Sequence, residues 1–303
     1  MVVKKRQKVL SHGRPPVAQK KERMSSKRSR TIIREHHRLE KERAIALKKG
    51  DVKLANDIKE AIEKNGGIEG YQAASKQGQS KDRGGDSSKL LVEWLQHAKV
   101  LKSDISISKD EPNLIKRCPH GSGSSNIPYR LLEIGALSTQ NAISKFPKLI
   151  DVTRIDLNSQ GDGIEQQDFM KRPLPSSDNE KFDIVSLSLV VNFVPEAVQR
   201  GEMLKRVARF LRSKEPPIES EESVLPALFL VLPLSCVANS RYMDEDLLVQ
   251  IMHNLGFVLT NRKKTSKLCY HLFKLDNEDN RVKTEKKMII DGPGMNNFCI
   301  VVE

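Results

Sequence analysis

A single glycine turn and an acidic residue, placed at the ends of two neighbouring predicted strands, give the clearest chemical signal in this sequence. Residues 131–134 (Leu-Leu-Glu-Ile) form an apolar run that ends at Gly135, and a second run, Val152–Ile155, ends at Asp156. A glycine lets a ligand approach the backbone where a Cβ would block it. A carboxylate about twenty residues later can accept both hydroxyl groups of a ribose. The spacing therefore favours a nucleoside site between the two strand ends.

The number of glycines limits which ligand such a turn can bind. A dinucleotide-binding turn has the pattern G-x-G-x-x-G, because a pyrophosphate must approach the start of the following helix. Here Leu137 and Thr139 stand where further glycines would be expected. A nucleoside without phosphate groups fits better, and S-adenosylmethionine is the obvious candidate. A single glycine is a weak signal, so an ordinary βαβ unit in which Asp156 only caps a loop stays open at this point.

The elements that must hold these residues form an alternating series of strands and helices. We expect helices over residues 139–146, 196–211 and 244–255, and further strands over residues 163–168, 182–191, 227–232, 256–259, 268–275 and 298–302. Such alternation predicts a doubly wound α/β sheet, mostly parallel, with the carboxyl ends of the parallel strands at one edge. The final run of strands without helices predicts an antiparallel edge strand.

The residues before this sheet predict a tail followed by a helical extension. Residues 1–30 are polar and rich in Lys and Arg, so we expect a disordered basic tail. Residues 31–115 are expected to form the helical extension and residues 116–303 the sheet domain. Apolar residues recur every three or four positions over residues 31–64, which predicts two helices with Asp51 as the N-cap of the second.

The sequence predicts three different environments for the aromatic residues of the helical extension. The charged surroundings of His36–His37 favour a solvated helix face over a metal site. Residues 67–85 are polar and rich in Gly, Ser and Gln, yet they contain Tyr71, which a surface linker would not need. An amphipathic helix is expected over residues 87–101, with Trp94 packed against the sheet.

The formal net charge of +13 lies entirely in the first fifty residues, which hold 17 Lys and Arg against 4 Asp and Glu. We expect this basic arm to bind RNA phosphates through counterion release and to act in nuclear targeting, with a solubilising tail as the alternative. No apolar run approaches the length of a membrane helix, and no apolar stretch follows the basic N-terminus. Neither a membrane span nor a secretory signal is therefore expected.

The four cysteines lack the spacing of a metal site or of a disulfide framework. Cys118, Cys236, Cys269 and Cys299 contain no C-x-x-C pair, which predicts free thiols in a reducing compartment. His120 lies close to Cys118 in sequence, but the two have no partner ligands, so no metal is expected. We expect the protein to be a monomer.

Several motifs, in order, resemble one family: LLEIGALS, RIDLNS, QQDFM, FDIVSLSLVVNFVP and NSRYM, with GYQAASKQGQS upstream and NNFCIVV near the end. From about Ile68 onward the chain is similar to the fungal nucleolar adenine-N1 methyltransferases of the large-subunit (25S) ribosomal RNA. The resemblance implies a Rossmann-like class I methyltransferase fold with S-adenosylmethionine as methyl donor. The implied partner is 25S rRNA or a pre-ribosomal particle, and the implied location is the nucleolus, within the nucleus. It also implies that Gly135 in LLEIG and Asp156 in RIDL bind the cofactor.

Further candidate residues follow from the general fold and from the chemistry of the reaction. Asp168, at the end of the third strand, can accept the exocyclic amine of adenine. A ring N1 has an in-plane lone pair and no proton to lose, so placement of an unpaired or extruded base does most of the work. Candidate residues for this placement are Asn192 at the base edge, Phe193 for stacking, and Arg241 and Tyr242 for phosphate contact and stacking. Capping, packing or loop roles stay open for all four.

Two other functions stay open on the sequence. Animal relatives of similar sequence act as cofactor sensors, so one alternative is a non-catalytic S-adenosylmethionine-binding regulator that docks a protein partner. The basic arm favours the enzyme, because a cytosolic sensor has no need of it. An NAD-dependent oxidoreductase is disfavoured by the missing glycines and by the lack of a convincing catalytic pair.

Overall fold

A computed structural model describes residues 24–78, 85–101, 127–159, 161–212, 223–277 and 282–303. Its helices are α1 (Ser26–Lys48), α2 (Val52–Lys64), α3 (Gly67–Gly78), α4 (Ser88–His97), α5 (Ala197–Phe210), α6 (Ser235–Ala238) and α7 (Glu245–Asn254), with 3-10 turns η2 (Ala142–Lys145), η3 (Asp178–Glu180) and η4 (Val191–Phe193). Its strands are β1 (Tyr129–Ile134), β2 (Ile150–Asp156), β3 (Glu165–Gln166), β4 (Ile184–Ser188), β5 (Ala227–Pro233), β6 (Phe257–Lys264) and β7 (Leu268–Leu275). The expectations for residues 1–23, Cys118 and His120 fall outside the described ranges.

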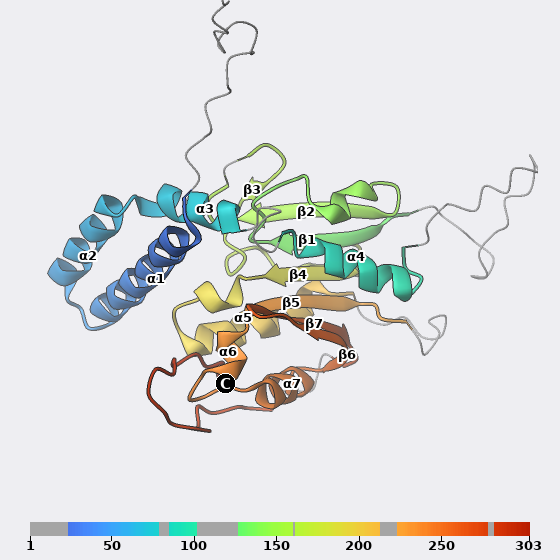
Figure 1. Cartoon of the computed structure of the whole chain (residues 1–303). Helices are drawn as coiled ribbons and strands as arrows, with labels where there is room; N and C mark the ends of the chain where they lie inside the picture. Colours follow the sequence, from blue (N-terminus) through green and yellow to red (C-terminus); the bar gives the residue numbers. More distant parts are fainter. Residues whose placement is uncertain (1–23, 79–84, 102–126, 160, 213–222, 278–281) are drawn as a thin grey trace, which may run out of the picture.

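Within the described ranges, seven strands form one sheet in the order β3-β2-β1-β4-β5-β7-β6 (Figure 1). Strands β1 to β5 are parallel, and β7 pairs antiparallel with both β5 and β6. This order confirms the doubly wound, mostly parallel sheet with an antiparallel strand near its edge. After β3 the chain crosses to the other side of β1, and ligands of such sheets bind at the carboxyl ends of the strands beside this reversal.

Apolar side chains on both faces of the sheet make two cores. Leu132 and its neighbours pack with α5 and α7 on one face, whereas Leu131 packs with α4 on the other. Strands covered on both faces need continuous apolar runs rather than alternation, which is what β4 and β5 contain. Trp94 on α4 lies edge-on to the Phe229 ring, 5.9 Å between centroids, which confirms the predicted packing against the sheet.

The helical extension is a three-helix unit in which α1 and α2 form a hairpin and α3 contacts α1 (Figure 1). The hairpin turns at Gly50, whose φ is +76°, and the Asp51 carboxylate accepts a hydrogen bond from the Leu54 N–H at 3.0 Å. The predicted N-cap is therefore confirmed. Helix α1 begins at Ser26, before the expected start at residue 31, and residues 67–78 form α3. The hairpin has a small core of its own: Leu39, Ala46, Ala55, Ile58 and Ile62.

The helix predicted over residues 139–146 is wrong, because only the 3-10 turn η2 forms there. Side chains of Asp86 and Ser88 accept hydrogen bonds from the first N–H groups of this turn. Pro147 follows its end and cannot continue a helix. Too few residues remain between these limits for an α-helix.

Two predicted strands are shorter in the structure. The strand expected over residues 182–191 ends at Ser188, because Leu189 adopts a left-handed φ of +60° that turns the chain. The strand expected over residues 163–168 is reduced to β3, two residues long, after a turn at Gly163 with φ +81°. The turn at Leu189 leads into η4, so Asn192 and Phe193 follow the carboxyl end of β4.

The strand predicted over residues 298–302 is absent from the sheet. This segment packs against α5, where the Val301 N–H donates to the Ala197 carbonyl at 3.0 Å. Gly201 makes the approach possible, since a Cβ there would lie 1.9 Å from the Val301 carbonyl oxygen. The apolar residues that suggested a strand are therefore buried against a helix.

No helix of the described ranges is long and apolar enough to cross a membrane. The same residues contain no group of His, Cys, Asp and Glu side chains that could hold a metal ion. Cys236, Cys269 and Cys299 are buried free thiols.

Candidate functional site

The structure brings Gly135 and Asp156 to adjacent strand ends at the carboxyl edge of the sheet. Strands β1 and β2 pair in parallel, and the Gly135 N–H donates to the Ile155 carbonyl at 2.8 Å. Gly135 has a φ of +77°, and a Cβ there would lie 2.6 Å from Cγ2 of Val190, in the loop after β4. Glycine is therefore required twice, by the backbone conformation and by the close approach of this loop.

The carboxylate of Asp156 is held by residues from two elements. Its Oδ1 accepts hydrogen bonds from the Asn158 N–H at 2.8 Å and from the Gln72 amide on α3 at 3.4 Å. Gln72 also donates to the Asn158 carbonyl at 2.6 Å and accepts from the Asn158 side chain at 3.1 Å. Burial raises the pKa of Asp156, and the Asn158 N–H partly offsets this by favouring the ionised form.

Gln72 is a residue of the site that sequence reasoning missed. Its side chain is 3% exposed although it belongs to a polar segment. The available signal was its neighbour Tyr71, an aromatic residue in a stretch that otherwise resembles a linker. In the structure, these two residues connect α3 to the strand ends, so the helical extension forms one wall of the site.

An aromatic cluster of His36, His37, Tyr71 and Phe193 joins α1 and α3 to the loop after β4. His36 stacks on Tyr71 at 4.7 Å between ring centroids, His37 lies 4.1 Å from Phe193, and Tyr71 lies edge-on to Phe193 at 5.5 Å. The expectation that His36–His37 lies on a solvated face is therefore wrong. The reason is tertiary, because α3 and the β4 loop cover this side of α1.

The environment of His37 predicts a dependence of stability on pH. Burial, followed by the positive charges of His36 and Lys41, lowers the pKa of His37 from 6.5 to about 3. A lowered pKa in the folded state means that the unfolded chain binds the proton more readily, so stability is full above pH 6.5 and falls as the pH drops below it. Between pH 7 and pH 5, we expect His37 to account for a loss of about 2 kcal/mol in the free energy of unfolding.

Urea unfolding of the wild type and of His37→Phe at both pH values measures this contribution. The variant should lose about 2 kcal/mol less than the wild type between pH 7 and pH 5. His97→Gln, at an exposed position, is the matched control. Its free energy of unfolding should depend on pH as that of the wild type does. An unchanged pH dependence in His37→Phe would show that the ring is not held buried against Phe193.

Asn192 and Phe193 lie in η4, directly after the turn at Leu189. The Asn192 Oδ1 atom is buried and accepts no hydrogen bond from the residues that the structure describes. A buried amide oxygen without a donor costs about 1–3 kcal/mol, so this position suits a donor supplied by a ligand. The adjacent Phe193 ring packs against His37 and Tyr71, which holds it in place.

Asp168 lies beyond the end of β3. Its Oδ1 accepts a hydrogen bond from the Met170 N–H at 2.9 Å, and its Oδ2 lies 3.8 Å from the Lys171 ammonium group. These contacts shape the loop after β3, and binding of an adenine amine by Asp168 stays a prediction.

Arg241 and Tyr242 contact the C-terminal segment rather than Asn192 and Phe193. The Arg241 guanidinium donates to the Asp291 carboxylate at 2.7 Å, to the Met295 carbonyl at 2.6 Å and to the Gly292 carbonyl at 2.9 Å. The Lys286 ammonium group lies 4.1 Å from the centre of the Tyr242 ring. The guanidinium therefore already binds the protein's own chain, and phosphate contact by Arg241 stays a prediction.

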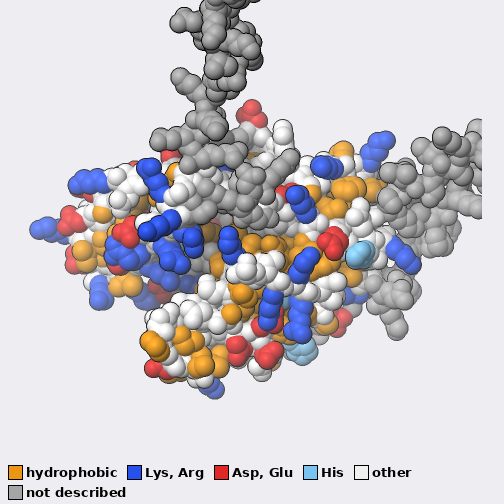
Figure 2. Space-filling model, viewed as in Figure 1, with side chains coloured by type: hydrophobic (Ala, Val, Ile, Leu, Met, Phe, Trp, Pro, Cys, Tyr) orange, Lys and Arg blue, Asp and Glu red, His pale blue; other side chains and the backbone are white. Residues whose placement is uncertain are grey.

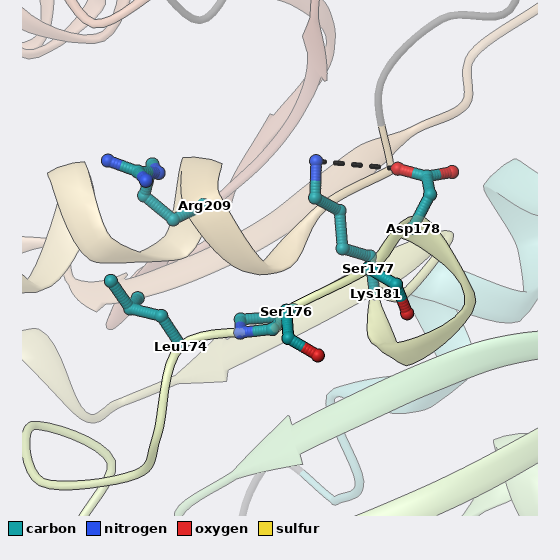
Figure 3. A pocket seen from close by; sticks show the side chains of 7 residues that line it. Leu174, Ser176, Ser177, Asp178, Lys181 and Arg209 are labelled. Atoms are coloured by element: carbon teal, nitrogen blue, oxygen red, sulfur yellow. Dashed lines mark ion pairs between the residues drawn. The ribbon is translucent and has the colours of Figure 1, made fainter.

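A pocket of about 350 Å³ lies at the opposite edge of the sheet (Figure 3). It is lined by Leu174, Pro175, Ser176, Ser177, Asp178, Lys181 and Arg209. The Lys181 ammonium group lies 3.4 Å from the Asp178 carboxylate. Most of these residues precede β4, at its amino end, whereas Gly135 and Asp156 follow the carboxyl ends of their strands. The pocket is thus separate from the site at the glycine turn.

The sheet order, the antiparallel β7 and the glycine turn beside an acidic strand end together define a class I methyltransferase fold. A comparison with known families identifies the branch within this class. The family described as "25S rRNA (adenine(2142)-N(1))-methyltransferase, Bmt2" matches residues 56–300, and the chain belongs to this family. The resemblance seen in the sequence motifs is thereby confirmed.

Two curated relatives support the same assignment. The 25S rRNA (adenine(2142)-N(1))-methyltransferase of Saccharomyces cerevisiae is 38% identical over 251 residues, which cover 82% of this chain and 64% of that protein. The chain thus spans less than two thirds of the length of this relative. The 25S rRNA adenine-N(1) methyltransferase of Schizosaccharomyces pombe is 35% identical over 272 residues, 89% of each chain. A solved structure, "Crystal structure of TnmH", matches with a TM-score of 0.39 at 11% identity, over 83% of this chain and 69% of that one.

Proposed function

We propose that the protein transfers a methyl group from S-adenosylmethionine to N1 of an adenine in 25S ribosomal RNA. The observation that carries the proposal is the meeting of Gly135 and Asp156 at neighbouring strand ends, beside a buried oxygen of Asn192 that has no hydrogen-bond donor among the described residues. The names of the two fungal relatives supply the reaction and the RNA.

The residues at the glycine turn fit the cofactor. Gly135 turns the chain sharply at the end of β1, and Asp156 offers carboxylate oxygens for the two ribose hydroxyl groups. Gln72 and Asn158 hold this carboxylate in place, so little side-chain freedom is lost when a ligand binds. When bound, S-adenosylmethionine supplies an electrophilic methyl group on a sulfonium centre.

The residues after β4 fit an extruded adenine. The amide oxygen of Asn192 can accept a hydrogen bond from the exocyclic amine, which is next to N1 on the Watson–Crick edge. Phe193 can stack on the base with ring surface that His37 does not cover. Because N1 has an in-plane lone pair and no proton to lose, the protein needs to place the base rather than to deprotonate it.

We further propose that the protein acts in the nucleolus, on 25S rRNA or on a pre-ribosomal particle. The basic arm at the start of the chain supports this location, since it adds affinity for phosphates without sequence choice. A cofactor-binding regulator would have the same cofactor contacts but no turnover on rRNA, so transfer of the methyl group separates the two functions.

Primer extension on 25S rRNA tests the proposal directly. N1-methyladenosine blocks the Watson–Crick edge, so we expect a stop in RNA from wild-type cells that disappears from cells lacking the protein. The wild-type gene should restore the stop, whereas a gene encoding Asp156→Ala should not. A stop that persists in cells lacking the protein would contradict the proposed reaction.

A further inference from the structure

Helix α1 carries an excess of basic residues. The helix contains eight Lys and Arg residues and three Glu residues. Each glutamate lies within 4 Å of an arginine: Glu35 and Glu42 pair with Arg38 at 2.6 and 2.7 Å, and Glu40 pairs with Arg43 at 3.7 Å. The three glutamates thus pair with only two of the arginines, and basic residues outnumber acidic residues in the helix by eight to three.

Four of the remaining basic residues, Lys27, Arg34, Lys41 and Lys48, form what we call the α1 stripe. They are spaced seven residues apart, which is nearly two helical turns, so they lie along one side of the helix. All four are exposed, and none lies within 4 Å of a carboxylate among the described residues. Figure 2 shows basic side chains gathered over α1 on the face in view.

The α1 stripe runs beside the candidate site. His37, which contacts Phe193, is three residues after Arg34 and four before Lys41, so it occupies a neighbouring position on the helix surface. Desolvation and then the positive charge of Arg200 on α5 lower the pKa of Lys41, so this middle part of the stripe lies near α5. The stripe therefore borders the loop that holds Asn192 and Phe193.

We propose that the α1 stripe binds the phosphate backbone of the substrate RNA and guides one strand toward Phe193. The proposal rests on the proposed function and adds a surface to it. Successive charges along the stripe are about 10.5 Å apart, close to the screening length of about 10 Å at 0.1 M salt. Their fields therefore overlap, and an extended polyanion can contact several of them at once.

The composition of α1 favours RNA over an anionic membrane surface. A helix that lies on a membrane needs a broad apolar face beside its basic residues. Among the described residues of α1, the large exposed apolar side chains are confined to Ile45 and Leu47 near its C-terminal end, which is too few for a membrane-binding face. The basic residues match the backbone contacts of nucleic-acid binding, which need no apolar surface.

The test replaces three residues of the α1 stripe in the full chain: Lys27→Gln, Arg34→Gln and Lys48→Gln. Lys41 is kept because it lies next to α5. Binding of labelled oligoadenylate is measured by fluorescence anisotropy over a range of salt concentrations. We expect the slope of log affinity against log salt to become smaller by about 2, and the affinity near physiological salt to fall by about 10- to 100-fold.

A matched control removes the same charge elsewhere, by Lys53→Gln, Lys59→Gln and Lys148→Gln at exposed positions outside α1. The control should keep the wild-type slope, and both variants should keep the wild-type affinity for S-adenosylmethionine. Equal losses in both variants, or an unchanged slope in the α1 variant, would overturn the proposal. Binding to phosphatidylserine vesicles is measured as well. The proposal would also be overturned if the α1 variant bound RNA as the wild type does and lost only its binding to these vesicles.

Methyl transfer to an rRNA fragment by the wild type is measured in parallel. If the wild type binds RNA through the α1 stripe but transfers no methyl group, the proposed function fails and the RNA surface stands. If transfer occurs and the α1 variant binds and reacts as the wild type does, the RNA surface fails and the proposed function stands. The two failures are thus distinguishable.

Discussion

Gly135→Ala is expected to lower the affinity for S-adenosylmethionine by about 100-fold or more, which corresponds to about 2.8 kcal/mol. Two effects combine. An alanine at a φ of +77° is strained by about 1 kcal/mol or more, and its Cβ would lie 2.6 Å from Cγ2 of Val190. Relief of this clash must move the loop after β4 or the turn itself. Either movement displaces backbone that the cofactor is expected to contact.

Asp156→Asn tests the other half of the site without a change of shape. An amide keeps one acceptor oxygen but loses the charge, and hydrogen bonds to a charged group contribute about 1.5–3 kcal/mol each. We expect about 10- to 100-fold weaker cofactor binding. The Asn158 N–H can still donate to the side-chain oxygen, so the free energy of unfolding should change little.

Isothermal titration calorimetry with S-adenosylmethionine measures both variants, and circular dichroism confirms that they are folded. Gly50→Ala is the matched control for Gly135→Ala, because Gly50 has nearly the same φ, +76°, but no atom within 4 Å of its added Cβ. The control carries the backbone strain alone and should bind the cofactor as the wild type does. Wild-type affinity in Gly135→Ala would remove the glycine turn from the site.

The parts of the fold that the sequence predicted well are those fixed by burial. Strands β4 and β5 are covered on both faces, so their continuous apolar runs left little choice of structure. The start of α2 was equally predictable, because the Asp51 carboxylate caps it by a local hydrogen bond to the Leu54 N–H, three residues later in the sequence. The placement of Gly135 and Asp156 at neighbouring strand ends was predictable because parallel strands bring their carboxyl ends to one edge of the sheet.

The parts that the sequence did not predict depend on contacts between distant segments. Gln72 and Asp156 are 84 positions apart, and no local pattern marks the amide as buried. His37 was assigned to solvent because its neighbours in sequence are charged, whereas its neighbours in space are aromatic. The segment after residue 297 has the composition of a strand, but a glycine on α5 allows it to pack against that helix instead.

Arg200→Leu is expected to destabilise the protein by about 3–5 kcal/mol, because the substitution leaves buried polar groups unpaired. The Arg200 side chain is 2% exposed and its guanidinium lies 4.6 Å from the centre of the Phe298 ring. It donates to the carbonyls of Val194, Pro195 and Cys299 at 2.9, 3.0 and 2.5 Å. A leucine leaves all three carbonyls without this donor and separates the C-terminal segment from the loop after η4.

The consequence for the site follows from where two of those carbonyls lie. Val194 and Pro195 directly follow Phe193, so Arg200 holds the residues expected to place the base. We expect methyl transfer to rRNA to fall in Arg200→Leu, and also in Arg200→Lys, because a single ammonium group does not reproduce the planar fork of a guanidinium. Cofactor affinity should stay within a few fold of the wild type at a temperature where the variant is folded, since neither Gly135 nor Asp156 contacts this side chain.

Urea unfolding measures the free energy of unfolding of these variants. The control is Arg209→Leu, at an exposed arginine on the same helix, whose free energy of unfolding should change by less than about 0.5 kcal/mol. If Arg200→Lys kept wild-type stability and wild-type transfer, one hydrogen bond would suffice and the three-carbonyl bridge would not be what positions Phe193.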